Sequence, residues 1–178
     1  ARAAELSMAM TVTAEVTPEC RIVLATDPGS PGADRFRLLR MRLKELRAAA
    51  DVRAVLVTSP LPQDGKSTVA LNLATALAEG GKRTVLLIEA DLHHPSLAKT
   101  LQLKPAPGFC ECVADGLPPL SLVQKVNPLG WYLMQAGTMT GNPSDLLQHA
   151  ALPGVMQTLS DAFDWVIIDT PPVVLLSD

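Results

Sequence analysis

The feature that most constrains the fold is the stretch VTSPLPQDGKSTVALNLA, which runs from Val57 to Ala74. It reads as the end of an apolar strand, a tight proline-containing loop, and a helix opened by Gly65-Lys66-Ser67-Thr68. The first amides of a helix have no partners inside the helix, and its aligned peptide dipoles place about half a positive charge there. A strand, a loop and a helix in this order therefore predict a turn that binds an anion such as phosphate.

The residue types in this turn suit a nucleotide. Loop amides can wrap phosphate oxygens, Lys66 can reach the terminal phosphates, and the Ser67 hydroxyl can bind Mg²⁺. The nucleotide motif is usually written G-x-x-x-x-G-K-[ST], and Pro60 stands at its first glycine position. The alternative is a plain strand–turn–helix in which G-K-S-T only begins the helix. The expected cofactor-binding residues are Pro62, Gln63, Asp64, Gly65, Lys66, Ser67 and Thr68.

Strand-like and helix-like segments alternate along the rest of the chain. Apolar runs predict strands at 53–59, 83–91, 130–137 and 164–172, of which the first two read as buried on both faces. Helical patterns cover 34–50, 67–81 and 143–162, and short helices are expected between 96 and 126. This order predicts an α/β fold, with a mostly parallel open sheet flanked by helices. Residues 1–31 read as an N-terminal tail or arm, and residues 32–178 as one domain with a core of its own.

Three acidic residues stand at the carboxyl ends of these expected strands. Glu89 and Asp91 close one strand, and Asp169 closes another. In open α/β sheets, ligands bind at the carboxyl ends of the strands, and carboxylates there can hold Mg²⁺ directly or through water. The alternative is that these acids cap neighbouring helices. Together with the Gly-Lys-Ser turn, they predict a Mg²⁺–nucleotide site.

The composition excludes several classes of protein. The formal net charge is −3 and aromatic residues make up 3%, so nucleic acid is not an expected partner. Cys110 and Cys112 form a lone C-x-C, whereas a zinc site needs four ligands, so reduced thiols in a cytosolic compartment are expected. No apolar run approaches the roughly 18 residues that span a bilayer, so attachment to a membrane would need another segment or protein.

Four segments resemble motifs of one protein family, the bacterial tyrosine kinases of capsule and exopolysaccharide export. SPLPQDGKST (59–68), LLIEADLHHP (86–95) and VIIDTPP (166–172) resemble its nucleotide motifs, and ADRFRLLR (33–40) resembles a helix that joins its subunits. The family is related to the partition and septum-placement ATPases. Leu61 stands where partition ATPases carry an extra lysine, which favours the kinase branch.

The resemblance implies a P-loop kinase that uses ATP and Mg²⁺ to phosphorylate tyrosine. Its catalytic residues would be Lys66, Glu89 and Asp91. Glu89 stands where the family has an aspartate, and it would accept the tyrosine proton. The metal would be held by Ser67, Asp91 and Asp169.

Two departures from the family keep other functions open. The tyrosine cluster that the family phosphorylates is absent, and the single tyrosine, Tyr132, lies in an expected strand. The resemblance also implies that the last strands of the domain, with the base-binding segment, are missing. The alternatives are a catalytically weak or inactive nucleotide-binding regulator of the same system and a partition-type ATPase switch.

The resemblance further implies partners. Asp34, Arg37 and Arg40 would contact a neighbouring subunit in a homo-oligomeric ring. A membrane co-polymerase subunit, or a fused membrane domain, would hold the ring at the cytoplasmic face of the membrane. The basic stripe that continues through Lys44 and Arg47 could instead be a solvated helix face or a contact with anionic lipid.

Overall fold

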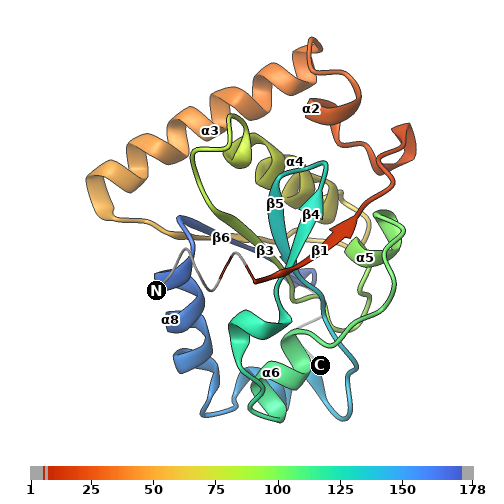
Figure 1. Cartoon of the computed structure of the whole chain (residues 1–178), viewed down its shortest axis with the longest axis vertical. Coiled ribbons are helices and arrows are strands. Elements are labelled where there is room, and N and C mark those ends of the chain that lie inside the picture. Colours follow the sequence, from red (N-terminus) through yellow and green to blue (C-terminus); the bar gives the residue numbers. More distant parts are fainter. Residues whose placement is uncertain (1–5, 7, 174–178) are drawn as a thin grey trace.

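A twisted, mostly parallel sheet forms the centre of the molecule (Figure 1). The structure is a computed structural model that describes residues 6 and 8–173. Within these residues the strand order is β1-β4-β5-β3-β6-β2. The strands are β1 (Met10–Thr13), β2 (Ala54–Val57), β3 (Val85–Glu89), β4 (Gln124–Asn127), β5 (Trp131–Met134) and β6 (Trp165–Asp169). Strands β5, β3, β6 and β2 run parallel, while β4 is antiparallel to β5 and parallel to β1. The predicted fold class is confirmed.

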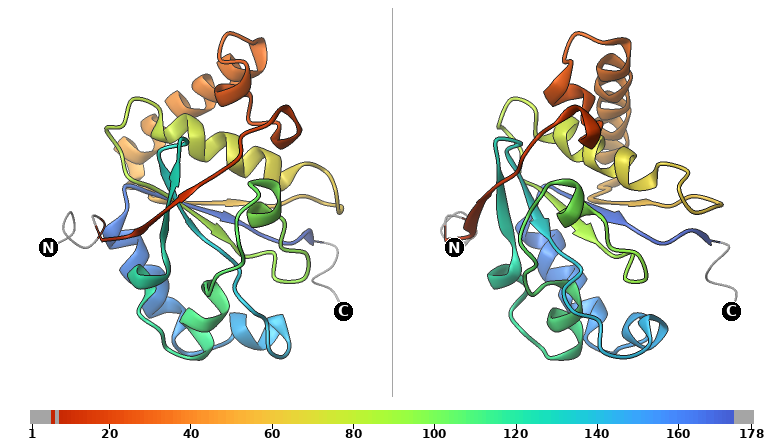
Figure 2. Two further views of the ribbon diagram at one scale, coloured as in Figure 1. Left: turned by 45° about the vertical axis from the view of Figure 1, so that its right-hand side comes forward. Right: turned by 90° about the vertical axis from the view of Figure 1, so that its right-hand side faces the viewer.

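Helices cover both faces of the sheet, as Figures 1 and 2 show. One face carries α3 and α4, and the other carries α6 and α8. The helices are α2 (Val23–Thr26), α3 (Pro31–Ala50), α4 (Lys66–Ala78), α5 (Leu97–Thr100), α6 (Phe109–Ala114), α7 (Pro143–Leu147) and α8 (Leu152–Ala162), with 3₁₀ turns η1 (Pro18–Cys20) and η2 (Pro119–Leu122). Helix α4 ends just before Gly80 and Gly81, which take positive φ.

Strand β3 shows how the sheet separates two hydrophobic cores. All five of its residues are buried. Because side chains alternate across a strand, Leu87 packs with Leu73 of α4, while Leu86 and Ile88 pack with Leu159 of α8. The prediction that this strand is buried on both faces is confirmed. Its position in the middle of the sheet brings its carboxyl end beside that of β6, with Glu89 opposite Asp169.

The N-terminal segment differs from the expected tail. Residues 10–13 form β1 at one edge of the sheet, and Ile22 is fully buried in the core that α4 also lines. This part of the expected tail therefore belongs to the folded domain. The short polar strand MTVT carries little signal of its own and depends on pairing with β4. Residues 1–5 and 7 of the expected tail, and 174–178 of the expected domain, lie outside the described residues.

Other differences concern local boundaries. Strand β2 was expected to be buried on both faces, but it pairs with β6 alone among the described strands, and Leu56 is 60% exposed. An apolar run does not reveal whether its strand lies at the centre or the edge of a sheet. Strand β4 occupies a region expected to be helical, and the expected helix at 143–162 is two helices, α7 and α8.

The state of the cysteines and the lengths of the helices were also expected from the sequence. Cys20, Cys110 and Cys112 are free and buried, as expected, and burial raises the pKa of both Cys110 and Cys112 to about 11. In the part of the chain that the structure describes, every helix is too short or too polar to cross a bilayer.

Candidate functional site

The loop between β2 and α4 is a tight turn held by its own polar groups. The Asp64 carboxylate accepts the Leu61 N–H at 3.0 Å, and the Ser59 hydroxyl donates to the Leu61 carbonyl at 2.8 Å. Gln63 and Gly65 have φ of 66° and 92°, a region that glycine adopts far more easily than other residues. These two residues turn the chain into the first turn of α4, whose amides have no helical partners. The strand, loop and helix therefore follow in the expected order.

Lys66, the first residue of α4, makes an ion pair with Asp91. Its Nζ lies 2.9 Å from Asp91 Oδ2, and the two side chains are 11% and 3% exposed. The other oxygen, Asp91 Oδ1, accepts the His94 N–H at 3.1 Å. The pair joins the turn before α4, which the sequence predicts to bind phosphate, to the segment that follows β3. A polyphosphate that binds Lys66 has to compete with the Asp91 carboxylate for the ammonium group.

Ser67 and Asp169 form the second contact between the motifs. Burial raises the pKa of Asp169 to about 6, against the opposing effects of a hydrogen bond from Ser67 and the nearby Lys66 ammonium. Asp169 Oδ1 is buried and has no hydrogen-bond partner among the residues described. A buried carboxylate oxygen without a partner is costly, so this position suits a bound cation.

The oxygen atoms at this position fit Mg²⁺. Magnesium usually takes one or two carboxylates, and completes its shell with water and substrate phosphates. The Ser67 hydroxyl and the unpartnered Asp169 oxygen are ligands of this kind, whereas Asp91 is committed to Lys66 and His94. No cluster of three or more His, Cys, Asp or Glu side chains in the described ranges is arranged to hold a metal ion. Magnesium would therefore need oxygens from a nucleotide as well.

A cavity of about 610 Å³ opens beside the turn, which is a size typical of small-molecule sites. Of the residues predicted from the sequence, it is lined by Pro62, Gln63, Gly65, Lys66, Ser67, Thr68 and Asp91. The cavity thus gathers most of the expected phosphate contacts. Asp64 is absent from its lining, because the Asp64 carboxylate turns back to close the loop.

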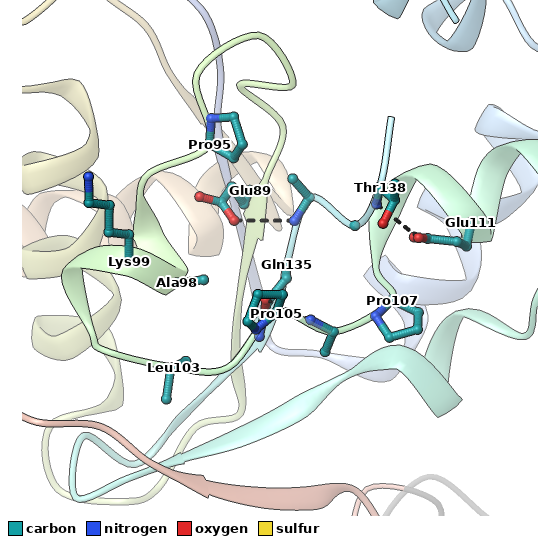
Figure 3. A pocket seen from close by; sticks show the side chains of 13 residues that line it. Glu89, Pro95, Ala98, Lys99, Leu103, Pro105, Pro107, Glu111, Gln135 and Thr138 are labelled. Carbon is teal, nitrogen blue, oxygen red and sulfur yellow. Dashed lines mark hydrogen bonds between the residues drawn. The ribbon is translucent and has the colours of Figure 1, made fainter. Parts of the chain in front are cut away.

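Glu89 lies on another cavity, of about 510 Å³, between α5, the 103–107 loop and the end of β5 (Figure 3). Its Oε1 accepts the N–H groups of Ser96 and Leu97 at 2.6 and 2.5 Å, and its Oε2 accepts the Ala136 N–H at 3.2 Å. The carboxylate therefore fastens the start of α5 to the end of β5. Its assignment as the acceptor of the tyrosine proton stays a prediction.

The same cavity has a second anchored carboxylate, Glu111 (Figure 3). Glu111 accepts the Gly108 and Thr138 N–H groups, both at 2.8 Å. Gly137 sits so close to this carboxylate that a Cβ there would lie 1.9 Å from Glu111 Oε2. The polar groups of this cavity thus serve mainly to hold the segment after β5 in place.

Three arginines of α3, Arg37, Arg40 and Arg47, contact other elements of their own chain. Arg37 binds Glu79 through Nε and Nη2 at 3.1 and 3.0 Å, and pairs with Asp34 at 3.1 Å. Arg40 also pairs with Glu79, and donates to the Ala76 carbonyl at 3.0 Å. Arg47 lies over the Trp165 ring. A freely solvated stripe is therefore the wrong description of these arginines. Whether Asp34, Arg37 and Arg40 also contact another subunit stays a prediction.

These arginines are also remote from the phosphate-binding turn of their own chain. Arg37 and Arg40 gather at Glu79, just after the last turn of α4, whereas Lys66 is the first residue of that helix. A helix of 13 residues separates the two ends by about 20 Å.

Two residues of the site lie outside the motifs recognised in the sequence. Arg21 lines the same cavity as Lys66, although it lies in the expected tail. Asn72 is 1% exposed on α4 and binds the backbone on either side of Ile22. A lone polar residue within VALNLATALA is a signal that could have identified Asn72, whereas nothing in the sequence marks Arg21.

Comparison with known proteins places these features among relatives. A family model described as ParA, NUBPL iron-transfer P-loop NTPase, matches residues 52–174. Tyrosine-protein kinase YwqD of Bacillus subtilis (strain 168) is 30% identical over 157 residues, which are 88% of this chain and 66% of that protein. Putative tyrosine-protein kinase EpsB of Ralstonia solanacearum is 34% identical over 151 residues, or 85% of this chain and 20% of that protein. The chain thus spans just under two thirds of one relative and a fifth of the other.

Solved structures agree with this grouping. The BceF tyrosine kinase domain is 30% identical, with a TM-score of 0.76 over 97% of this chain and 65% of that chain. The septum site-determining protein MinD from Pyrococcus horikoshii OT3, solved with Mg-ADP, has a TM-score of 0.56 at 24% identity, over 67% of this chain and 49% of that chain. The MinD likeness concerns the fold alone.

Proposed function

The chain belongs to the ParA family of P-loop NTPases, and from this premise we propose that it binds MgATP and transfers the γ-phosphate to a tyrosine hydroxyl. The observation that carries the proposal is the meeting of Lys66, Ser67, Asp91 and Asp169 at one rim of the sheet. The kinase relatives, at 30% and 34% identity, supply the reaction type.

Phosphoryl transfer asks the protein mainly for positioning and for neutralisation of charge. The amides of Gln63, Asp64 and Gly65 would donate to phosphate oxygens. Before the nucleotide binds, Asp91 holds Lys66 in an ordered position beside the cavity, and Lys66 would then exchange this bond for the β- and γ-oxygens. Bound at Ser67 and Asp169, Mg²⁺ would neutralise charge on the same phosphates.

The acceptor would come from outside the described core. Tyr132 is half-buried on β5, and its ring packs edge-on against Phe163 at 5.3 Å between centroids. A hydroxyl in this position is poorly placed to reach Lys66. A tyrosine of another segment or another chain is the better substrate, which agrees with action on a neighbouring subunit of a ring.

The wider role that we propose is control of capsule or exopolysaccharide polymerisation and export. The names of the relatives support it: they include the putative kinase EpsB and the succinoglycan biosynthesis transport protein ExoP of Rhizobium meliloti (strain 1021). The chain would act at the cytoplasmic face of the membrane, held there by a co-polymerase subunit or a fused membrane domain.

The test is incubation with γ-labelled ATP, Mg²⁺ and a glutamate–tyrosine copolymer. Transfer of label to the copolymer, lost in Lys66→Met, is the expected result. Free labelled phosphate without labelled copolymer would assign an ATPase instead. Absence of nucleotide binding in the wild-type protein would refute the proposal altogether.

One observation favours a second function, that of a nucleotide-binding regulator without transferase activity. Both oxygens of Glu89 accept hydrogen bonds from backbone N–H groups, so in this structure the carboxylate serves to hold the start of α5 against the end of β5. MgATP binding without labelled copolymer or released phosphate would assign this function.

A further inference from the structure

We propose that Arg21 binds the phosphate groups of the nucleotide, as a second cation opposite the phosphate-binding turn, and that Asn72 holds it in position. The proposal rests on the proposed nucleotide function and adds a residue to that site. Arg21 lies outside the three motifs that form the rest of the site.

The backbone around Arg21 is fastened to the helix that carries Lys66. The Asn72 side chain donates to the Arg21 carbonyl at 2.7 Å and accepts the Val23 N–H at 2.8 Å. It also donates to the Thr68 carbonyl at 2.9 Å, in the first turn of α4. A buried amide with all of these bonds ties the 21–23 segment to the phosphate-binding turn.

The Arg21 side chain is exposed on the cavity that Lys66 and Ser67 also line. Within the ranges that the structure describes, its guanidinium forms no ion pair. The backbone of Arg21 has a φ of 52°, a left-handed conformation that is costly for a residue with a Cβ. Glycine would adopt this backbone more easily, so a contribution to the stability of the fold does not explain why position 21 is an arginine.

The net formal charge of the site is negative unless Arg21 is included. Lys66, Asp91 and ionised Asp169 together carry a formal charge of −1, which does not attract a polyphosphate. With Arg21 the sum becomes zero before Mg²⁺ is counted. A guanidinium is also the side chain best suited to bind phosphate oxygens in pairs.

The experiment is calorimetric titration of the full chain with MgATP. Arg21→Ala should weaken binding about tenfold, which is the usual loss for one hydrogen bond to a charged group. Arg21→Lys should recover part of the affinity. Arg21→Gly should lose as much affinity as Arg21→Ala without a lower melting temperature, because glycine suits the backbone. Arg35→Ala, which removes an exposed arginine from α3, is the matched control and should bind as the wild type does.

Three outcomes of these titrations would overturn the assignment of Arg21 to phosphate binding. Wild-type affinity in both Arg21→Ala and Arg21→Gly would overturn it and leave the proposed function standing. A weaker Arg21→Ala with a lowered melting temperature, beside an Arg21→Gly of normal affinity, would assign Arg21 a structural role and also overturn it. A wild-type protein that binds no MgATP would overturn both this proposal and the proposed function.

Discussion

The ammonium of Lys66 and the carboxylate of Asp91 are 2.9 Å apart, and this ion pair joins the turn before α4 to the segment after β3. Two motifs that are far apart in the sequence thereby share one pair of charges. The pair prepares Lys66 for an anion, because a side chain already ordered loses less entropy when a ligand binds. It also means that a phosphate group has to compete with the Asp91 carboxylate for the ammonium of Lys66.

Replacement of Lys66 by methionine should weaken MgATP binding at least about tenfold, because the variant loses a charged hydrogen bond to phosphate. Methionine keeps much of the length of the side chain without its charge. Calorimetry on the variant and on Lys82→Met, an exposed lysine beyond α4, gives the measurement and its control. Equal affinities of wild type and Lys66→Met would remove Lys66 from the site.

Replacement of Asp91 by asparagine should tighten the binding of ADP in the presence of EDTA, by a few-fold. Lys66 then no longer has to leave an anionic partner, while asparagine can still accept the His94 N–H. Chelation removes any effect of Asp91 on a metal. Weaker ADP binding under these conditions would show that Asp91 supports phosphate binding and does not compete with it.

At Gln63, glycine should give a more stable protein than alanine does, by about 1 kcal/mol, since φ is 66° there and a Cβ is strained in that region. Gln157, an exposed residue inside α8, is the matched control. Glycine should be the less stable choice there, by a similar amount. Denaturant unfolding of the four variants measures both differences, and the same order at both positions would contradict the strained turn.

Asp169→Asn should stabilise the metal-free protein at neutral pH. Burial raises the pKa of Asp169 to about 6, from an ordinary value of 3.8. Below pH 3.8 the group is protonated in both folded and unfolded states, so the variant and the wild type should then be equally stable with respect to it. As the pH rises towards 6, the unfolded state gains from ionisation before the folded state does, and the wild type loses stability relative to the variant.

The advantage of Asp169→Asn should therefore grow between pH 4 and 6 and stay level above 6, reaching roughly 3 kcal/mol. Unfolding in EDTA across this range measures it. A constant difference at every pH would show that the Asp169 carboxylate is not perturbed. The same variant should lose Mg²⁺-dependent enhancement of nucleotide binding, because a neutral amide replaces the carboxylate whose Oδ1 has no hydrogen-bond partner.

Much of the fold could be predicted because its signals are local. Apolar runs, helical spacing and the glycines after α4 each act within a few residues, and they indicate the class of sheet and most of its elements. The convergence of Asp91 and Asp169 was also predictable, since parallel strands place their carboxyl ends at one edge. The edge position of β2 and the pairing of β1 with β4 were not, because neither leaves a mark within the strand itself.

The sequence by itself thus determined that a phosphate-binding turn and strand-end acids share one rim of an α/β sheet. Only the tertiary structure decided how individual side chains are used there. Glu89 accepts backbone N–H groups at the start of α5 and just after β5. Arg37 and Arg40 pair with Glu79 of their own chain. Arg21 reaches the cavity because Asn72, 51 residues later, holds its backbone. Such contacts join residues far apart in the chain, so they depend on how the finished elements pack and have no counterpart in local spacing.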